Sequence, residues 1–169
     1  RIPAGVLKLF KNEHFDWNFE GENEKQLADR SIYLCRGKVL GGSSCANVLL
    51  YHRGNSEDYR KWAEITKSDE WSPESVLPYF KKSEDDFRGP SKYHGIGGEY
   101  AVSEVKYQNP LSATFLRGCA DAGFPANDDF NNWARDQTGY GRYQVNERNG
   151  ERSSTSADFL DPVKGRSNL

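Results

Sequence analysis

The 169-residue sequence lacks the features that mark several large classes of protein. No apolar run approaches the ~18–20 residues that cross a membrane, and no cleavable signal pattern opens the chain. A net charge of −2 leaves no basic excess to neutralise phosphates, which argues against nucleic-acid binding. Only three cysteines occur (Cys35, Cys45 and Cys119), and their odd number and wide spacing fit neither a disulfide framework nor a zinc site. Free thiols in a reducing compartment are the simpler expectation.

The sequence is also poor in apolar residues. Hydrophobic residues make up 36% of the chain, and the mean hydropathy is −0.88. Four Trp, nine Tyr and nine Phe supply core volume instead, because each aromatic ring buries a large area. We therefore expect an ordered chain in which some hydrophobic strands of a larger domain are missing. The first residue, Arg1, favours the same interpretation, an internal or processed piece.

Hydrophobic spacing and capping residues predict short helices and strands joined by long loops, an α+β fold class. The predicted helices cover 4–10, 55–65, 72–80, 109–123 and 153–160, the last stopped by Pro162. The predicted strands cover 16–20, 99–105 and 140–145, and Asn149-Gly150 predicts a hairpin turn. No composition shift marks an internal boundary, so residues 1–169 are expected to lack a separate second domain.

The stretch Gly41-Gly42-Ser43-Ser44 is the most informative local motif. Two glycines beside two small hydroxyls let backbone N–H groups approach a phosphate or a flat ring. A helix that starts there would add its positive dipole, and Asn47 would lie one turn into that helix. For the isolated motif, a tight turn between a strand and a helix is the simpler alternative. The order of residues matches neither the dinucleotide GxGxxG nor the P-loop pattern.

With its neighbours, the motif resembles the first signature of the glucose–methanol–choline (GMC) flavin oxidoreductases. The resemblance covers nearly the whole chain, and its motifs occur in family order. They are Asp16-Trp17, Arg36 to Asn47, Tyr51-x-Arg53-Gly54, Asp58-Tyr59-x-x-Trp62, the stretch from Trp71-Ser72 to Glu84, Tyr93-His94-Gly95-x-x-Gly98, and the stretch from Gly139-x-Gly141 to Gly150-x-Arg152. It implies an incomplete FAD-binding domain of GMC type that runs into the start of the substrate-side region.

The resemblance also implies FAD as the cofactor. It places the FAD contacts at Val39, Gly41, Gly42, Ser43, Ser44, Asn47, Val48, Leu49 and Leu50. Choline oxidase links its flavin covalently through a His at the position of Ala46, and Ala46 has no nucleophile, so non-covalent FAD is expected. The family's GxGxxG motif and its C-terminal catalytic residues are not in this sequence. No catalytic residue and no metal ligand is therefore expected within it.

Within the family, four stretches resemble algal fatty acid photodecarboxylases: Ile2 to Val6, Gly41-Gly42-Ser43-Ser44, Leu50 to Gly54, and Asn127-x-Asp129-Phe130-Asn131-x-Trp133. Choline-type members usually carry Val or Ile where this chain has His52. The resemblance implies light-driven conversion of a free fatty acid to a hydrocarbon and CO2, in the chloroplast. Two alternatives stay open: a dark alcohol dehydrogenase or oxidase that transfers hydride from a primary alcohol to FAD, with a cytoplasmic location possible, and a truncated, non-catalytic chain.

The remaining polar candidates have simpler structural explanations. His52 is expected to be packed and hydrogen-bonded rather than a proton shuttle. His14 and His94 fall in predicted loops and are expected to be exposed to solvent. The run Glu84-Asp85-Asp86 predicts a solvated helix end, and Cys119 is expected in the core on an apolar helical face.

Overall fold

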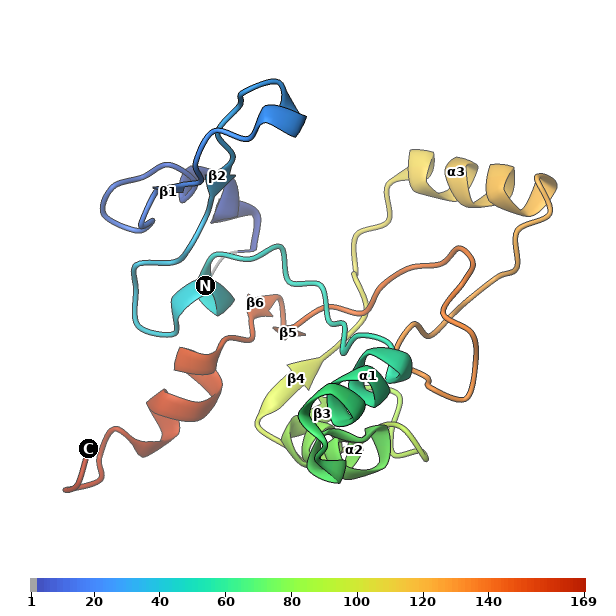
Figure 1. Ribbon diagram of the computed structural model, residues 1–169. Coiled ribbons are helices and arrows are strands. Elements are labelled where there is room, and N and C mark those ends of the chain that lie inside the picture. Colours follow the sequence, from blue (N-terminus) through green and yellow to red (C-terminus); the bar gives the residue numbers. More distant parts are fainter. Residues whose placement is uncertain (1–2) are drawn as a thin grey trace. The chain divides into compact units, whose positions relative to one another are not determined.

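The computed structural model describes residues 3–169, so Ile2 of the stretch Ile2 to Val6 lies outside the described part. The chain has the predicted α+β character, with short strands and helices linked by long loops (Figure 1). It divides into two compact units. Unit 1 comprises Arg1–Leu49 and Glu147–Leu169, and unit 2 comprises Leu50–Asn146. No helix among the described residues has both the length and the apolar character needed to cross a membrane.

The three α-helices of the described residues lie in unit 2 and begin at the predicted caps. α1 (Ser56–Thr66) starts with a capping box in which the Asn55 side chain accepts from the Glu57 N–H at 2.9 Å. α2 (Pro73–Ser83) has Ser72 as N-cap and Pro73 in its first turn. α3 (Pro110–Asp121) is capped by Asn109, and Gly123 follows its end with a φ of 81°. These local signals confirm three of the five predicted helices.

A small set of paired segments forms the centre of unit 2. β3 (Glu84–Asp86) pairs in parallel with β4 (Tyr100–Val102), with Glu84 opposite Tyr100. Beyond β4, Ser103 bridges Val145, and Val145 also bridges Leu50. The predicted strand 99–105 is therefore confirmed in shorter form. The predicted strand 140–145 is wrong, because its two ends pair with different segments: Tyr140 bridges Ala126, and Val145 bridges Ser103 and Leu50.

Unit 2 is held together by a partly exposed aromatic cluster, in which Trp62 is 49% and Trp71 44% exposed, and by buried polar side chains. Tyr59 contacts Trp62 and Trp133 at centroid distances of 5.3 Å, and Trp62 contacts Trp71 at 5.5 Å. Asn131 is fully buried; its side chain accepts from the Arg53 N–H at 2.9 Å and donates to the Tyr51 carbonyl at 3.0 Å. Hydrogen bonds from buried polar side chains therefore connect segments of unit 2 that apolar packing would connect in a more hydrophobic chain.

Unit 1 is built from turns around buried Asp16. β1 (Phe19–Glu20) pairs antiparallel with β2 (Tyr33–Leu34). The predicted strand 16–20 is too long, because Asn18 has a φ of 51° and breaks the extended backbone. Burial raises the pKa of Asp16, but hydrogen bonds from the Tyr33 hydroxyl and from three backbone N–H groups outweigh it and hold that pKa well below its usual range.

The two ends of unit 1 depart from the predicted α-helices. The first is a 3-10 helix, Pro3–Lys8. Near the C-terminus a π-helical turn, Ser156–Leu160, continues into a 3-10 helix, Asp161–Val163. Pro162 therefore does not stop the helix, since it lies in the first turn of the second segment, where its missing N–H has no partner to lose. The predicted hairpin is confirmed: β5 (Glu147–Arg148) and β6 (Glu151–Arg152) flank Asn149 and Gly150, both with positive φ.

Candidate functional site

The glycine–serine stretch forms a tight turn followed by a four-residue 3-10 helix, Gly42–Cys45. Gly41 and Gly42 have φ values of 92° and 55°, a region that favours glycine. The longer helix expected after this turn is wrong, since Leu49 has a φ of 70° and Asn47 lies beyond the helix end. The predicted helix dipole therefore has no counterpart here.

Three glycines in this region meet different surroundings. A Cβ on Gly37 would lie 2.4 Å from the Gly42 carbonyl oxygen, and one on Gly41 would lie 2.7 Å from the Cβ of Ser156. Both glycines are therefore required by close packing. A Cβ on Gly42 would meet nothing within 4 Å. Gly42 thus leaves an open face on the turn that any other residue would fill.

The two serines and Asn47 hold the turn together. The Ser44 hydroxyl donates to the Gly41 carbonyl at 2.6 Å and accepts from the Thr155 N–H at 3.0 Å. The Ser43 hydroxyl accepts from the Gly37 N–H at 3.2 Å. Asn47 Oδ1 accepts from Arg152 Nη1 at 2.7 Å.

Ser44 and Asn47 therefore connect the turn to the C-terminal part of unit 1. The sequence does not predict that Arg152 and Thr155 are these partners. The motif Gly150-x-Arg152 marks Arg152, which lies two residues after the hairpin turn. No local sequence pattern indicates that Asn47 is its partner.

Around the turn, apolar side chains are left at the surface. Val39 is 36% exposed, Leu40 65% and Val48 61%, whereas Ala46 and Leu49 are buried. An open glycine face, an exposed serine and exposed aliphatic side chains form a surface suited to a flat, largely apolar ring with polar edges. The residues present in unit 1 therefore fit a flavin. Leu50, the remaining predicted contact, opens unit 2 and is half exposed.

A second constellation, in unit 2, is a buried cluster of charged side chains. Arg53 Nη2 lies 2.5 Å from Glu84 Oε1. His94 Nδ1 lies 3.1 Å from that oxygen and 3.0 Å from Asp86 Oδ2, while His94 Nε2 lies 2.8 Å from Asp129 Oδ2. The expectations of a solvated helix end at Glu84 to Asp86 and of an exposed His94 are wrong, because Glu84 and Asp86 belong to a buried strand that the His94 loop covers.

The contacts set the protonation of the cluster. Burial lowers the pKa of His94, but hydrogen bonds with Asp129, Asp86 and Glu84 outweigh it and raise the pKa to about 10. Burial raises the pKa of Asp86, yet the hydrogen bonds from His94 and Arg88 hold it well below its usual range. His94 is therefore a cation at neutral pH. His94 Nε2 lies 3.2 Å from Arg88 Nη2, but both atoms are hydrogen-bond donors, so they do not bond to each other. Nε2 donates to Asp129 and Nη2 donates to Asp86.

Glu84, Asp86 and His94 also have the ligand types of a metal site, with their atoms within 4.8 Å of one another. However, Arg53 pairs with Glu84, and Arg88 pairs with Asp86 at 2.8 Å. With Asp129 and protonated His94, the cluster holds three carboxylates against three cations. We interpret it as a self-neutralised ion network that binds segments of unit 2 together.

The other residues considered from the sequence have plain structural roles. His52 is hydrogen-bonded, as expected: its Nδ1 accepts from the Gly54 N–H at 3.0 Å, and its ring contacts Tyr143 at 5.6 Å. The residue is nevertheless exposed, so the expectation that it is packed is wrong. Cys119 is only half-buried, so its expected place in the core is wrong. α3 leaves most of its side chains exposed, which explains the difference.

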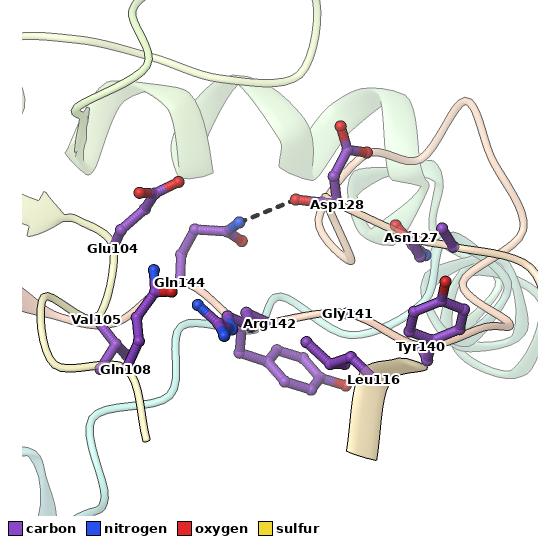
Figure 2. Close-up of a pocket in the computed structure, with 12 residues that line it drawn as sticks. Glu104, Val105, Gln108, Leu116, Asn127, Asp128, Tyr140, Gly141, Arg142 and Gln144 are labelled. Carbon is purple, nitrogen blue, oxygen red and sulfur yellow. Dashed lines mark hydrogen bonds between the residues drawn. The ribbon is translucent and has the colours of Figure 1, made fainter. Parts of the chain in front are cut away.

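Unit 2 also contains a pocket of about 310 Å³ between residues 104–108, the loop 126–128 and residues 140–144. Figure 2 shows Arg142 and Gln144 projecting from the same extended segment beside Leu116 of α3. Gln144 is buried, and its Nε2 donates to the Asp128 carbonyl at 3.2 Å. Gln144 Oε1 is buried and has no hydrogen-bond partner among the described residues.

The profile of GMC oxidoreductases matches residues 16–169. The chain belongs to the GMC oxidoreductase family. It is 42% identical over 99% of its length to a chloroplastic fatty acid photodecarboxylase of Chlamydomonas reinhardtii, of which it covers 27%. It is 39% identical over 99% of its length to an alcohol dehydrogenase [acceptor] of Pseudomonas putida, of which it covers 30%.

The GMC fold also has a solved counterpart. Pyridoxine 4-oxidase from Mesorbium loti superposes with a TM-score of 0.91 at 29% identity, over 99% of this chain and 33% of the oxidase. The GMC chain thus spans about a third of the length of the relatives it matches. The family resemblance and the α+β class expected from the sequence are confirmed.

The protonated state of His94 predicts a pH dependence of stability. The pKa of His94 is about 10 in the folded protein and 6.5 in its ordinary state. Its contribution to the free energy of unfolding is therefore complete below about pH 6.5 and is lost as the pH rises toward 10. The free energy of unfolding, measured by urea titration between pH 6 and 10, should fall by up to about 1.4 kcal/mol per pH unit from this group.

The control for this prediction is His94→Gln, compared with His14→Gln in a loop of unit 1. The His94 variant should be less stable at pH 6 and should lose the alkaline slope relative to the wild type, whereas the His14 variant should keep it. An unchanged slope in His94→Gln would show that the cluster does not hold a protonated imidazole.

Proposed function

We propose that this chain forms part of an FAD-dependent, light-driven fatty acid decarboxylase, which converts free fatty acids to hydrocarbons and CO2. The observation that supports this most is the 42% identity with the Chlamydomonas reinhardtii photodecarboxylase across 99% of the chain. We place residues 1–169 within one FAD-binding domain of GMC type, with the start of the substrate-side region. The relative's chloroplastic label supports the same location for this protein.

A dark alcohol dehydrogenase is the second candidate. It is favoured by the 39% identity with the Pseudomonas putida alcohol dehydrogenase and with an oxygen-dependent choline dehydrogenase of Chromohalobacter salexigens. The two functions share the cofactor and differ in the bond that is broken. A carboxylate loses CO2 in the first case, and an alcohol loses hydride in the second.

In both cases we propose that this chain supplies part of the flavin-binding surface. The open face of Gly42 admits the ring system, and the exposed side chains of Val39 and Val48 provide apolar contact. Ser44 and Asn47 keep the turn in shape through Thr155 and Arg152. The nine proposed contacts remain Val39, Gly41, Gly42, Ser43, Ser44, Asn47, Val48, Leu49 and Leu50. The chemistry that FAD supplies is one-electron oxidation of the carboxylate under blue light, with the electron and a proton returned to the alkyl product.

The proposed function is tested by comparing product formation under blue light and in darkness. The full-length protein with bound FAD should release hydrocarbon from hexadecanoate under blue light and none in darkness, as measured by gas chromatography. Bleaching of the flavin by hexadecan-1-ol in the dark, without hydrocarbon in the light, would instead establish the alcohol dehydrogenase.

The flavin contact of the turn is tested at Gly42. Gly42→Leu should reduce the affinity for FAD at least tenfold, measured by flavin fluorescence during titration, because the side chain fills the open face. Gly97→Leu is the matched control: Gly97 has a φ of 75° and open space around its Cβ, but lies in unit 2 outside the proposed contacts. Both variants carry a similar backbone strain of about 1–2 kcal/mol, so equal loss of FAD affinity would contradict the proposal.

We also propose that the FAD is held without a covalent bond. Ala46 is buried and offers no nucleophile at the position where choline oxidase links its flavin. Acid precipitation of the loaded protein should therefore leave the flavin in the supernatant, measured by its absorbance. Recovery of yellow flavin in the washed pellet would overturn this.

A further inference from the structure

Arg152 of β6 is a buried cation that contacts the glycine–serine turn of unit 1. Only 7% of its surface is exposed. Its Nη1 donates to the Ser44 carbonyl at 3.2 Å and to Asn47 Oδ1 at 2.7 Å. A guanidinium is costly to bury unless acceptors satisfy it. The buried position of Arg152 therefore holds these two acceptors in place as well as the cation.

The hydrogen bonds of Asn47 determine which way its carboxamide is turned. The Leu49 N–H also donates to Asn47 Oδ1, at 3.1 Å. A guanidinium and a backbone N–H can only donate, so both require the carbonyl oxygen of the carboxamide rather than its nitrogen. Asn47 is exposed, and its Nδ2 has no hydrogen-bond partner among the residues that the structure describes. The side chain therefore keeps its two N–H donors for a ligand.

A donor of fixed orientation beside the open face of Gly42 suits the acceptors of a flavin. The ring system carries carbonyl oxygens and ring nitrogens along its polar edge, and these gain negative charge when the flavin is reduced. A cation on Oδ1 also polarises the carboxamide and strengthens its N–H groups as donors. We propose that Arg152 is a positioning residue for FAD, which holds Asn47 with Nδ2 as the donor to the cofactor. The inference rests on the proposed flavin-binding surface and adds a residue outside its nine contacts.

The first test is Arg152→Met, which removes the donor to Asn47 and lets the carboxamide rotate. In the full-length protein the dissociation constant of oxidised FAD should rise roughly tenfold, as expected for the loss of one charged hydrogen bond. Reduced FAD should lose a further tenfold, because its acceptors are more negative, which lowers the two-electron midpoint potential by about 30 mV. Flavin fluorescence and a spectroscopic redox titration measure the two effects. Arg152→Lys keeps a cationic donor and should restore most of both values.

The second test separates action through Asn47 from general support of the turn. In an Asn47→Ala background, Arg152→Met should change the affinity for FAD at most about twofold further, since coupled residues are not additive. Equal effects of Arg152→Met in both backgrounds would overturn the positioning role. Asn47→Asp keeps an acceptor for Arg152 and for the Leu49 N–H but replaces the donor with an oxygen, so it should lower the midpoint potential in a folded protein.

The matched control is Arg30→Met, which removes another cation from unit 1. Arg30 is exposed, and its Nε donates to the Leu27 carbonyl at 2.9 Å. This variant should keep the affinity and the midpoint potential of the wild type. Circular dichroism identifies any variant that fails to fold. Where Arg152→Met does not fold, Asn47→Asp decides, because an unchanged potential in that variant would overturn the donor role.

The outcomes separate the positioning role from the reaction. Light-dependent hydrocarbon formation, with a wild-type potential and FAD affinity in Arg152→Met, would overturn the positioning role and leave the proposed function intact. A lowered potential that Arg152→Lys restores, without hydrocarbon in the light, would keep the positioning role and overturn the decarboxylase.

Discussion

The buried ion network of unit 2 is the constraint on which much of that unit depends. Glu84 and Asp86 come from β3, His94 from the loop that covers it, and Asp129 from a segment 35 residues further on. Burial of a charge is costly unless it is paired, and removal of one partner from a buried pair costs about 3–5 kcal/mol. Each ion therefore requires the others in place. The network joins segments that few hydrophobic contacts connect, in a chain of which 36% is hydrophobic.

Polar cross-links also hold other segments of unit 2 together. Asn131 binds the backbone of Tyr51 and Arg53, and Gln144 binds the Asp128 carbonyl. The Tyr51 N–H donates in turn to the Gln144 carbonyl at 2.9 Å. Hydrogen bonds thus fix the segment 140–145 against its neighbours without long strands. Bridges to other segments occur at the two ends of this segment, where Tyr140 pairs with Ala126, and Val145 pairs with Ser103 and Leu50.

Local signals in the sequence carried different amounts of structural information. Asn55, Ser72 and Asn109 cap α-helices because a side-chain oxygen satisfies an N–H two or three residues away, so the helix starts followed from the pattern alone. The hairpin at Asn149-Gly150 also followed from the local pattern, because Asn and Gly both adopt the positive φ that its turn requires. The burial of His94 could not be predicted in this way, because it depends on contacts with Glu84 and with Asp129, which is 35 residues away. A pattern of neighbouring residues does not reveal such contacts. Likewise, the role of Arg152 in fixing Asn47 joins residues 105 apart.

Two relatives of this chain are named for different chemistries, one as a fatty acid photodecarboxylase and one as an alcohol dehydrogenase. Relatives named for either chemistry are 42% and 39% identical to this chain across nearly all of its length, which is consistent with one cofactor-binding surface serving both. In flavoenzymes the cofactor carries out the reaction, while the protein selects and orients the reactant. A hydroxyl is satisfied by neutral donors and acceptors, whereas a carboxylate removed from water requires a cation. The proposed photodecarboxylase and the proposed alcohol dehydrogenase therefore require different polar groups at the reacting end of the substrate.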